Sequence, residues 1–199
     1  MGHKTVRLDT LVNIMTGVPM SRAKKIAGDD DPVKVKVLIP GAMSSGRIDD
    51  GLIATEEVSK VKEELFLREG DAVVKASTPY DCVFVDKRHE GLLPTSFGLI
   101  LRANSQGAVD MRYLAAYLGL ESTNKELQSM SKGISIKLIK KRDLGGLMVP
   151  VPTLEEQARL GSLYENTQGF KELCRAISEK SSVLLQSEFY RTVLDNDYP

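Results

Sequence analysis

The segment 149–157, with the sequence Val-Pro-Val-Pro-Thr-Leu-Glu-Glu-Gln, constrains the fold more than any other part of the chain. Pro150 and Pro152 favour an extended backbone, because each ring fixes its own φ angle and disfavours the α region at the preceding residue. Thr153 and Glu156 then have the S/T-x-x-E spacing of a capping box, which satisfies free N–H groups at the start of a helix. The segment therefore predicts an extended arm that ends where a long helix begins.

A heptad pattern follows this arm and continues to about residue 190. Apolar or small side chains recur at alternating steps of three and four residues, which is the spacing of a coiled-coil seam. Gly161 and Gly169 would each weaken the helix by about 1 kcal/mol relative to alanine, so we also consider a break near Gly169. Because a lone helix cannot bury its seam, we expect a partner: the chain's own domain, a second copy or another protein. The candidate partner-facing residues are Leu160, Leu163, Phe170, Cys174, Ile177 and Leu184.

The chain before the arm shows short strand patterns. Residues 6–15 predict a strand, a turn of helix near Asp9 and a second strand, and the alternating run 33–39 predicts a half-buried strand with a basic face. The runs 52–65 and 65–75 each predict two strands, with a turn at 69–71 in the second. Further strands are expected at 82–85, 92–101 and 134–139, and polar turns or loops at 21–31, 44–47 and 76–80.

Helical signals interrupt these strands. Asp110 is expected to cap one short helix, and the spacing of Thr123 and Glu126 predicts a capping box for a second. The fold class is therefore α+β: a strand-rich domain with a small helical insert, followed by a long C-terminal helix that forms a coiled-coil spacer. We place the first domain at residues 1–150 and the spacer at residues 151–199.

The charge composition limits any role in nucleic-acid binding to local clusters. The chain has 27 Lys plus Arg residues and 27 Asp plus Glu residues, so its formal net charge is zero. Segment 132–142 is the main basic cluster, because it holds five basic residues and no acidic residue. A cationic face could bind phosphates, although a solvated strand edge would have the same composition. Other cations that could join this face are Arg22, Lys24, Lys25, Arg47, Lys75 and Arg102.

Sequence motifs for catalysis are missing. The sequence has no P-loop, G-x-G-x-x-G, H-E-x-x-H or C-x-x-C motif, and we expect no metal and no cofactor. His3 and His89 are the only histidines, and His89 is expected in a solvated turn. Cys82 and Cys174 are expected to be free thiols in a reducing cytoplasm, because they are far apart and fit no metal spacing. A binding or scaffold role therefore ranks above catalysis.

Targeting and membrane signals are also missing from the sequence. No run approaches 18 apolar residues, and the N-terminal residues have no signal-peptide pattern. We therefore expect a soluble cytoplasmic protein that does not enter a membrane.

Several motifs follow one another in a recognisable order. Gly17, the run 67–75 (Leu-Arg-Glu-Gly-Asp-Ala-Val-Val-Lys) and the triplet 102–104 (Arg-Ala-Asn) precede the segment 129–139 and then the segment 143–157. In this order the chain resembles the DNA-specificity (S) subunits of type I restriction–modification systems. The resemblance covers nearly the whole chain, but includes only one target recognition domain and one spacer helix. No internal repeat is present, so the chain resembles a half-size S subunit.

The resemblance implies recognition of double-stranded DNA without catalysis. An S subunit of this family grips a bipartite DNA site, while separate methyltransferase (M) subunits and a restriction endonuclease (R) subunit carry out the chemistry. Its long helices pair antiparallel between two recognition domains and dock the M subunits. For a half-size form, we expect two copies to pair through the C-terminal helix, although one half of a heteromeric S subunit remains an alternative.

Polar loops on a strand scaffold are the candidate base-reading segments, and the basic cluster is the candidate phosphate-binding segment. A different class of function, a protein–protein adaptor whose recognition-like domain does not bind DNA, is kept open by the zero net charge. An independent enzyme ranks third. The candidate DNA-binding residues are Ser44, Ser45, Arg47, Lys75, Ser77, Thr78, Tyr80, Lys132, Lys137, Lys140, Lys141 and Arg142.

Overall fold

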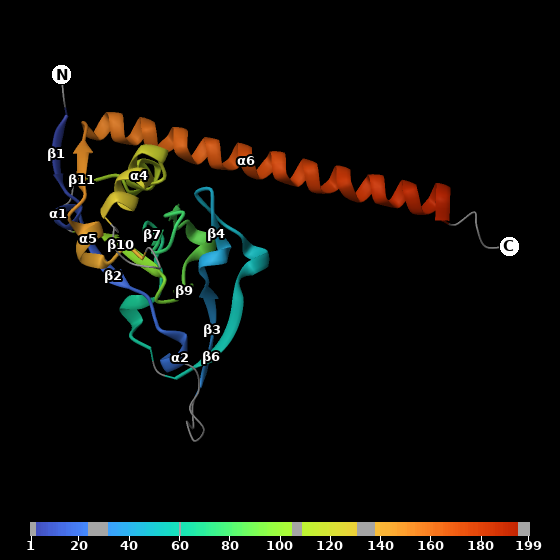
Figure 1. Ribbon diagram of the computed structural model, residues 1–199, viewed down its shortest axis with the longest axis horizontal. Helices are drawn as coiled ribbons and strands as arrows, with labels where there is room; N and C mark the ends of the chain where they lie inside the picture. Colours follow the sequence, from blue (N-terminus) through green and yellow to red (C-terminus); the bar gives the residue numbers. More distant parts are fainter. Residues whose placement is uncertain (1–2, 24–31, 60, 105–108, 131–137, 195–199) are drawn as a thin grey trace. The chain divides into compact units, whose positions relative to one another are not determined.

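The computed structural model of the chain describes residues 3–23, 32–59, 61–104, 109–130 and 138–194 (Figure 1). Contacts within the chain separate it into two units, Met1–Ser162 and Leu163–Pro199, which we describe one at a time. The first unit holds all the strands of the described residues and the first two turns of the long helix. The fold-class prediction of a strand-rich α+β domain followed by a long C-terminal helix is confirmed. The coiled-coil spacer and the domain boundary at residue 150 stay predictions.

The first elements match the mixed pattern of residues 6–15. Strand β1 (Lys4–Arg7) leads into the single helical turn α1 (Leu8–Leu11) and then into β2 (Val12–Thr16). The turn forms because the two leucines of α1 are buried on one side. β1 pairs antiparallel with β11 (Met148–Val151), so the N-terminal strand holds the arm that leads to the long helix.

The central sheet has the strand order β2–β10–β7–β8 and is antiparallel throughout. It contains β10 (Gly98–Ala103), β7 (Ala72–Lys75) and β8 (Cys82–Phe84), which are largely buried because they carry runs of valine, leucine and isoleucine. The predicted turn at 69–71 is present, with Gly70 at φ +89°. The strand expected immediately before that turn is wrong, because Glu63–Leu65 forms a 3₁₀ turn (η3) and no strand lies between η3 and the turn.

A second sheet has the order β6–β3–β9. It contains β6 (Ala54–Val58), β3 (Val33–Leu38) and the short β9 (Leu93–Pro94). As the alternation in 33–39 predicted, the lysines of β3 are exposed while Val35 and Val37 are buried. The expected loop at 21–31 begins instead with the helical turn α2 (Met20–Ala23), and residues 24–31 lie outside the described part of the chain.

The segment 40–52 builds a hairpin between two 3₁₀ turns. It runs from η1 (Pro40–Ala42) through β4 (Met43–Ser44) and β5 (Arg47–Ile48) to η2 (Asp50–Leu52). The buried side chains of Met43 and Ile48 join the hydrophobic cluster that contains Val83, Val85 and Leu92. The base of the hairpin is thereby packed against β8.

The helical insert consists of α3 (Met111–Leu118) and α4 (Glu121–Met130). Asp110 caps α3 as predicted, because its carboxylate accepts from the backbone N–H of Arg112 at 2.8 Å. The capping box at Thr123 is wrong: α4 begins earlier, and the buried hydroxyl of Thr123 donates to the carbonyl of Tyr117 at 2.8 Å. Most of the strand expected at 134–139 lies outside the described residues.

A further short helix, α5 (Lys141–Gly145), was not predicted. It begins at the end of the basic cluster, with Lys141 and Arg142, and packs beside α1 and β2 (Figure 1). Its buried Leu144 and Gly145 are covered by that contact, and Gly145 lies against the side chain of Asp9.

The capping box at the start of α6 (Leu154–Phe189) is confirmed. The backbone N–H of Thr153 donates to Glu156 Oε2 at 2.9 Å, and the N–H of Glu156 donates to Thr153 Oγ1 at 3.3 Å. The hydrogen bonds with Thr153 hold the pKa of Glu156 below its ordinary value. α6 continues through Gly169 without the break we considered, and a π-helical turn, η5 (Tyr190–Leu194), follows it.

The start of α6 is fixed to the strand-rich unit. Buried Gln157 accepts from the backbone N–H of Asp110 and donates to the carbonyl of Pro152, each at 2.9 Å. Gly161 lies against α3, where a Cβ atom would come within 3.1 Å of Arg112 Cβ. In the described residues no helix is both long enough and apolar enough to cross a membrane.

Candidate nucleic-acid interface

A single carboxylate joins the two polar segments that were expected to read bases. Asp81 Oδ1 accepts from the backbone N–H of Ser45 at 3.2 Å, and Asp81 Oδ2 pairs with Lys75 Nζ at 3.1 Å. The tip of the β4–β5 hairpin is a two-residue turn with positive φ angles at Ser45 (+53°) and Gly46 (+77°), the geometry of a type I′ turn. Asp81 therefore places the hairpin tip beside the loop 76–80.

The loop 76–80 is also joined to the basic cluster. Ser77 forms an isolated antiparallel bridge with Leu138, and the backbone N–H of Ile139 donates to the carbonyl of Ala76 at 2.8 Å. Lys140 follows directly and leads into α5. The hairpin, the loop and the start of α5 thus form one continuous stretch of structure, although they are far apart in sequence.

Four cations of this stretch are free to bind an anion. Within the described ranges, the side chains of Arg47, Lys140, Lys141 and Arg142 make no ion pair. The three residues of the basic cluster are exposed, and Arg47 is half-buried on β5. Unpaired cations can neutralise phosphates without first losing a protein partner, so these four are the candidate phosphate-binding cations of this stretch.

Two other predicted cations are engaged within the protein. The side chain of Lys75 is 12% exposed and pairs with Asp81. Arg102 forms a two-pronged ion pair with buried Asp71, and the hydrogen bond with that carboxylate raises the pKa of Arg102. The expectation that Arg102 belongs to a cationic face is corrected, because its charge is balanced inside the fold.

The loop 76–80 presents fewer side chains than the sequence suggested. Tyr80 is fully buried, so in this structure its ring cannot contact DNA as predicted. Its backbone is held by Asn124, whose Oδ1 accepts from the N–H of Tyr80 at 2.9 Å. Thr78 is exposed and Ser77 is half-buried, so these two remain accessible. Lys132 and Lys137 lie outside the described residues.

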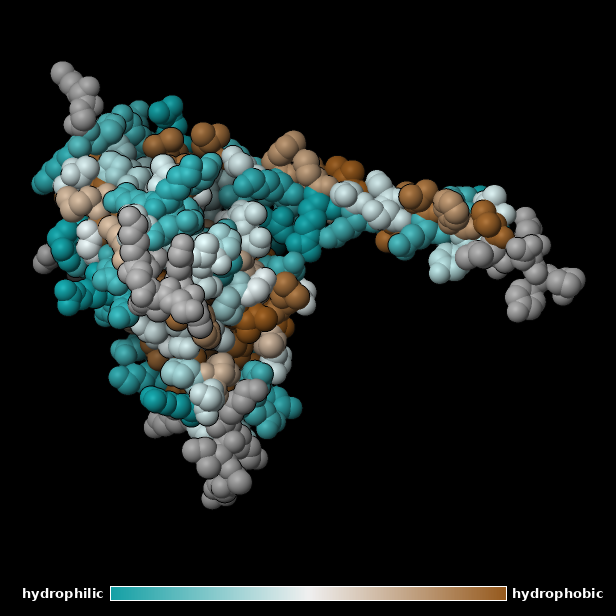
Figure 2. Space-filling model, in the orientation of Figure 1, coloured by the Kyte–Doolittle hydropathy of each residue, from teal (hydrophilic) through white to brown (hydrophobic). Residues whose placement is uncertain are grey.

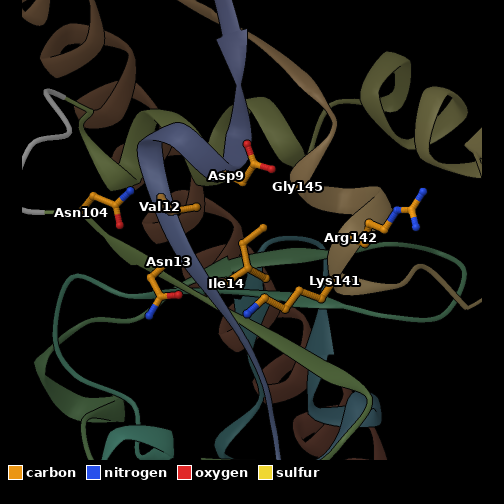
Figure 3. Close-up of a pocket in the computed structure, with 8 residues that line it drawn as sticks. All are labelled: Asp9, Val12, Asn13, Ile14, Asn104, Lys141, Arg142 and Gly145. Carbon is orange, nitrogen blue, oxygen red and sulfur yellow. The ribbon is translucent and has the colours of Figure 1, made fainter.

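A surface hollow of about 450 Å³ lies between β2, the end of β10 and α5 (Figure 3). The amine of Lys141 extends toward β2, while Asn13 and Asn104 lie on the opposite side of Ile14. The carboxylate of Asp9 also lines the hollow. It is paired with Arg7 at 2.5 Å, and the hydrogen bond from that arginine lowers the pKa of Asp9.

The sequence did not reveal every polar group of this interface. Asp81 gave no motif signal, because its two partners come from different elements, the tip of the β4–β5 hairpin and the end of β7. Asn13 lies in a predicted strand, and the only feature that could have indicated it is that a polar residue occupies an exposed position of that strand. Asn104 entered only through the family resemblance, and its amide donates to the carbonyl of Thr10 at 3.3 Å.

The second unit carries the predicted seam on α6. The four heptad side chains are each more than half exposed: Leu163, Phe170, Ile177 and Leu184. Cys174, a free thiol, is also exposed. Leu160, which belongs to the first unit, is half-buried. Other apolar side chains, including Leu173 and Val183, are also exposed on this helix, and Figure 2 shows apolar residues recurring along it. α6 therefore has apolar side chains on more than one face.

The described residues hold no cluster of three or more His, Cys, Asp or Glu side chains that could bind a metal ion. Cys82 is buried, and that burial raises the pKa of its thiol. His89 is not in a solvated turn, which corrects the prediction: it is buried, and both of its ring nitrogens have carboxylate partners.

Comparisons of the sequence with protein-family models and with curated proteins found no match. Solved structures gave matches. A chain from a study of complex assembly and conformational transition of the type I R-M system has a TM-score of 0.60 and 18% identity, covering 96% of this chain and 49% of its own length. The HsdS subunit from Thermoanaerobacter tengcongensis has a TM-score of 0.59 and 18% identity, with the same coverages of 96% and 49%.

The S subunit of the type I restriction–modification system from M. genitalium is also similar. Its TM-score is 0.58 at 14% identity, and the match covers 98% of this chain and 46% of that subunit. The chain therefore spans about half the length of each of these proteins. At such low identity, the likeness establishes a shared fold: a strand-rich domain followed by a long helix.

Proposed function

We propose that this chain is a half-size, non-catalytic DNA-specificity subunit of a type I restriction–modification system. The observation that carries the proposal is the continuous stretch from the β4–β5 hairpin to α5, which carries four unpaired cations on a fold shared with two S subunits. In this role the protein works in the cytoplasm and binds double-stranded DNA. M subunits and, through them, the R subunit carry out the chemistry.

The domain recognises DNA through two kinds of contact. Lys140, Lys141 and Arg142 bind phosphates and set the position of the domain on the duplex. Base edges are read by the exposed polar side chains of the hairpin tip and the loop 76–80. Arg47 is suited to guanine, because a guanidinium can donate to both O6 and N7 in the major groove.

A second copy of the chain packs against the exposed seam of α6. Two copies that pair antiparallel through Leu163, Phe170, Ile177 and Leu184 would restore two recognition domains and read a split palindromic site. The 36-residue helix is about 54 Å long at 1.5 Å per residue, which sets the length of such a spacer. Apolar side chains on the other faces of α6, such as Val183, are then available to an M subunit.

A salt titration tests the phosphate contacts. Lys140→Ala with Lys141→Ala should weaken binding to every duplex alike, and should flatten the plot of log K against log salt by about 0.9 for each phosphate that the variant no longer neutralises. Lys171→Ala with Lys180→Ala is the matched control, because it removes two exposed lysines from α6 that are not among the proposed DNA-binding residues. Equal slopes for the two double variants would remove the start of α5 from the interface.

Light scattering tests the pairing of α6. The wild-type chain should be a dimer at micromolar concentrations and Phe170→Glu should be a monomer, because the substitution places a charge in the seam. Glu165→Ala on the same helix should leave the dimer intact. A wild-type chain that stays a strict monomer without any partner would refute homodimerisation and favour a heteromeric half.

The second candidate function is a protein–protein adaptor whose recognition-like domain binds no DNA. The zero net charge favours it, as does the internal pairing of Lys75 and Arg102. An adaptor would capture an M subunit in a pulldown yet show no shift of random duplex at low salt. A salt-dependent shift of that duplex would exclude it.

A further inference from the structure

The most sharply defined polar cluster outside the interface centres on His89. The ring is buried, with Nδ1 lying 2.6 Å from Asp86 Oδ1 and Nε2 lying 3.2 Å from Asp50 Oδ1. Asp86 belongs to the same turn, η4 (Lys87–His89), as its N-cap. Asp50 belongs to η2, which is 39 residues away in sequence. The imidazole therefore links two separate turns.

Both ring nitrogens face a carboxylate oxygen, so the link depends on protonation. A neutral imidazole has one N–H donor, whereas an imidazolium has two. Only the charged ring can therefore donate to both carboxylates. When it loses a proton, the nitrogen facing the more distant Asp50 becomes an acceptor and the contact changes from attractive to repulsive.

Other charged groups of the two turns surround the ring. Arg88 donates from Nε to Asp86 Oδ2 at 3.0 Å, while Asp86 Oδ1 faces the imidazole and also accepts from the backbone N–H groups of Arg88 and His89. Burial acts to raise the pKa of Asp86, but the hydrogen bond from Arg88 and the charge of His89 outweigh it, and the pKa is lowered. Lys87 in the same turn is paired with Glu90. Asp50 is the charged group that faces the ring from η2, and its side chain is 68% exposed.

The link bears on the hairpin because η2 begins directly after β5. Residues on both sides of β8 hold the hairpin: Asp81, just before β8, binds its tip, and His89, after β8, binds the turn at its exit. The backbone N–H of Asp49 donates to the carbonyl of Ala42 at 2.8 Å and closes the base of the hairpin between these two points. A change at His89 is therefore transmitted to the segment proposed to read bases.

We propose that His89 is a positioning residue for DNA readout, whose doubly protonated ring clasps Asp50 to Asp86 and holds the β4–β5 hairpin in place. This inference rests on the proposed function. It gives the recognition of DNA a dependence on pH through a group that lies outside the interface. Binding is tight when the ring is charged and weakens when the ring is neutral.

The test compares full-length chains at about pH 6 and about pH 8, the range in which histidine acts as a pH-dependent switch. Hydrogen exchange at Asp49 reports on the base of the hairpin without DNA, as a protection factor corrected for the intrinsic effect of pH. Duplex binding is measured at the same two pH values. His89→Gln removes the charge, and Asp50→Asn keeps an acceptor while removing the carboxylate from an exposed position, where folding is not at risk.

For the wild type, protection at Asp49 and duplex affinity should each fall by about threefold to tenfold between the two pH values, the size expected for a partly exposed charged hydrogen bond. Both variants should resemble the wild type at high pH and lose most of this dependence. His3→Gln, which changes the only other histidine, should behave as wild type.

Two results would overturn the inference in distinguishable ways. If both variants keep the wild-type pH dependence of protection and affinity, His89 does not control the hairpin. If protection responds as expected but no duplex binds at either pH, the proposed function fails and the role of His89 in DNA readout fails with it, while the clasp itself stands.

Discussion

The ion pair between Arg102 and Asp71 allows a sharp test of how this fold uses its charges. Arg102 Nε donates to Asp71 Oδ1 at 2.9 Å, and Nη2 donates to Asp71 Oδ2 at 2.7 Å. Their side chains are 19% and 3% exposed. The guanidinium also donates to the carbonyls of Glu64 and Phe66, each at 3.0 Å, so it ties β10 to the turn η3. Arg102→Met keeps much of the length of the side chain but removes every one of these donors.

The expected loss of unfolding free energy follows from the buried carboxylate that remains. Breaking a buried ion pair from one side costs about 3–5 kcal/mol, because the remaining charge has no partner. Asp71 Oδ2 retains the backbone N–H of Arg68 at 2.8 Å, so we expect about 3 kcal/mol, the lower end of that range. Adding Asp71→Asn removes the stranded charge. The double variant should therefore recover about 1–2 kcal/mol relative to Arg102→Met alone.

Urea unfolding followed by circular dichroism measures these differences, and a duplex shift assay on the folded proteins measures DNA binding. Because the charge of Arg102 is used internally, folded Arg102→Met should bind duplex as wild type does. Arg47→Met is the matched control, and it should lower DNA affinity with little effect on stability. A stability change below about 0.5 kcal/mol for Arg102→Met, or reduced DNA binding at unchanged stability, would refute this reasoning.

Three further predictions concern other parts of the chain. Gly17→Ala places a Cβ within 2.3 Å of a carbonyl oxygen and should lower the free energy of unfolding by about 1–3 kcal/mol or more. Gly169→Ala meets no atom within 4 Å and should raise that free energy by about 0.5–1 kcal/mol. Thermal unfolding measures both variants, and similar effects on stability would contradict the close packing described around Gly17. Burial acts to raise the pKa of Asp110, but hydrogen bonds from Arg112 outweigh it and the pKa is lowered, so its stabilisation is lost as the pH falls below about 4. Asp110→Asn should therefore show a shallower loss of urea stability between about pH 6 and about pH 3, and an unchanged slope would reject that assignment. If two seams pair near their midpoints, mild oxidation should link the two Cys174 residues in a disulfide-bonded dimer. Cys174→Ser should form no such dimer, and a gel run without reductant shows whether the linked dimer is present.

Local signals in the sequence predicted the elements whose cause is local. The capping box of Thr153 and Glu156 and the cap at Asp110 were predicted because each needs only neighbouring residues. The strand–turn–strand order of residues 6–15 was predicted because its apolar spacing changes within a few residues. The helix α5 was missed, because five residues are too few to show a helical period.

The candidate site was harder to predict, because its members depend on distant partners. The basic residues at 140–142 were visible as a cluster, but nothing local indicates that Lys75 is held by Asp81. Tyr80 lies in a polar loop, and its burial depends on packing that the loop composition does not reveal. The burial of His89 likewise depends on a carboxylate 39 residues away. Long-range ion pairs and packing therefore decided which predicted residues remain accessible.

The shared carboxylate of Asp81 has a consequence for changing the DNA preference of such a domain. The hairpin tip and the loop 76–80 are coupled mechanically, because Ser45 and Lys75 bind opposite oxygens of one side chain. If the loop were exchanged together with Lys75, or the hairpin tip for one that places its backbone N–H elsewhere, one oxygen of Asp81 would lose its partner. The hairpin tip and residues 75–81 therefore form the smallest cassette that can be transplanted with its geometry intact.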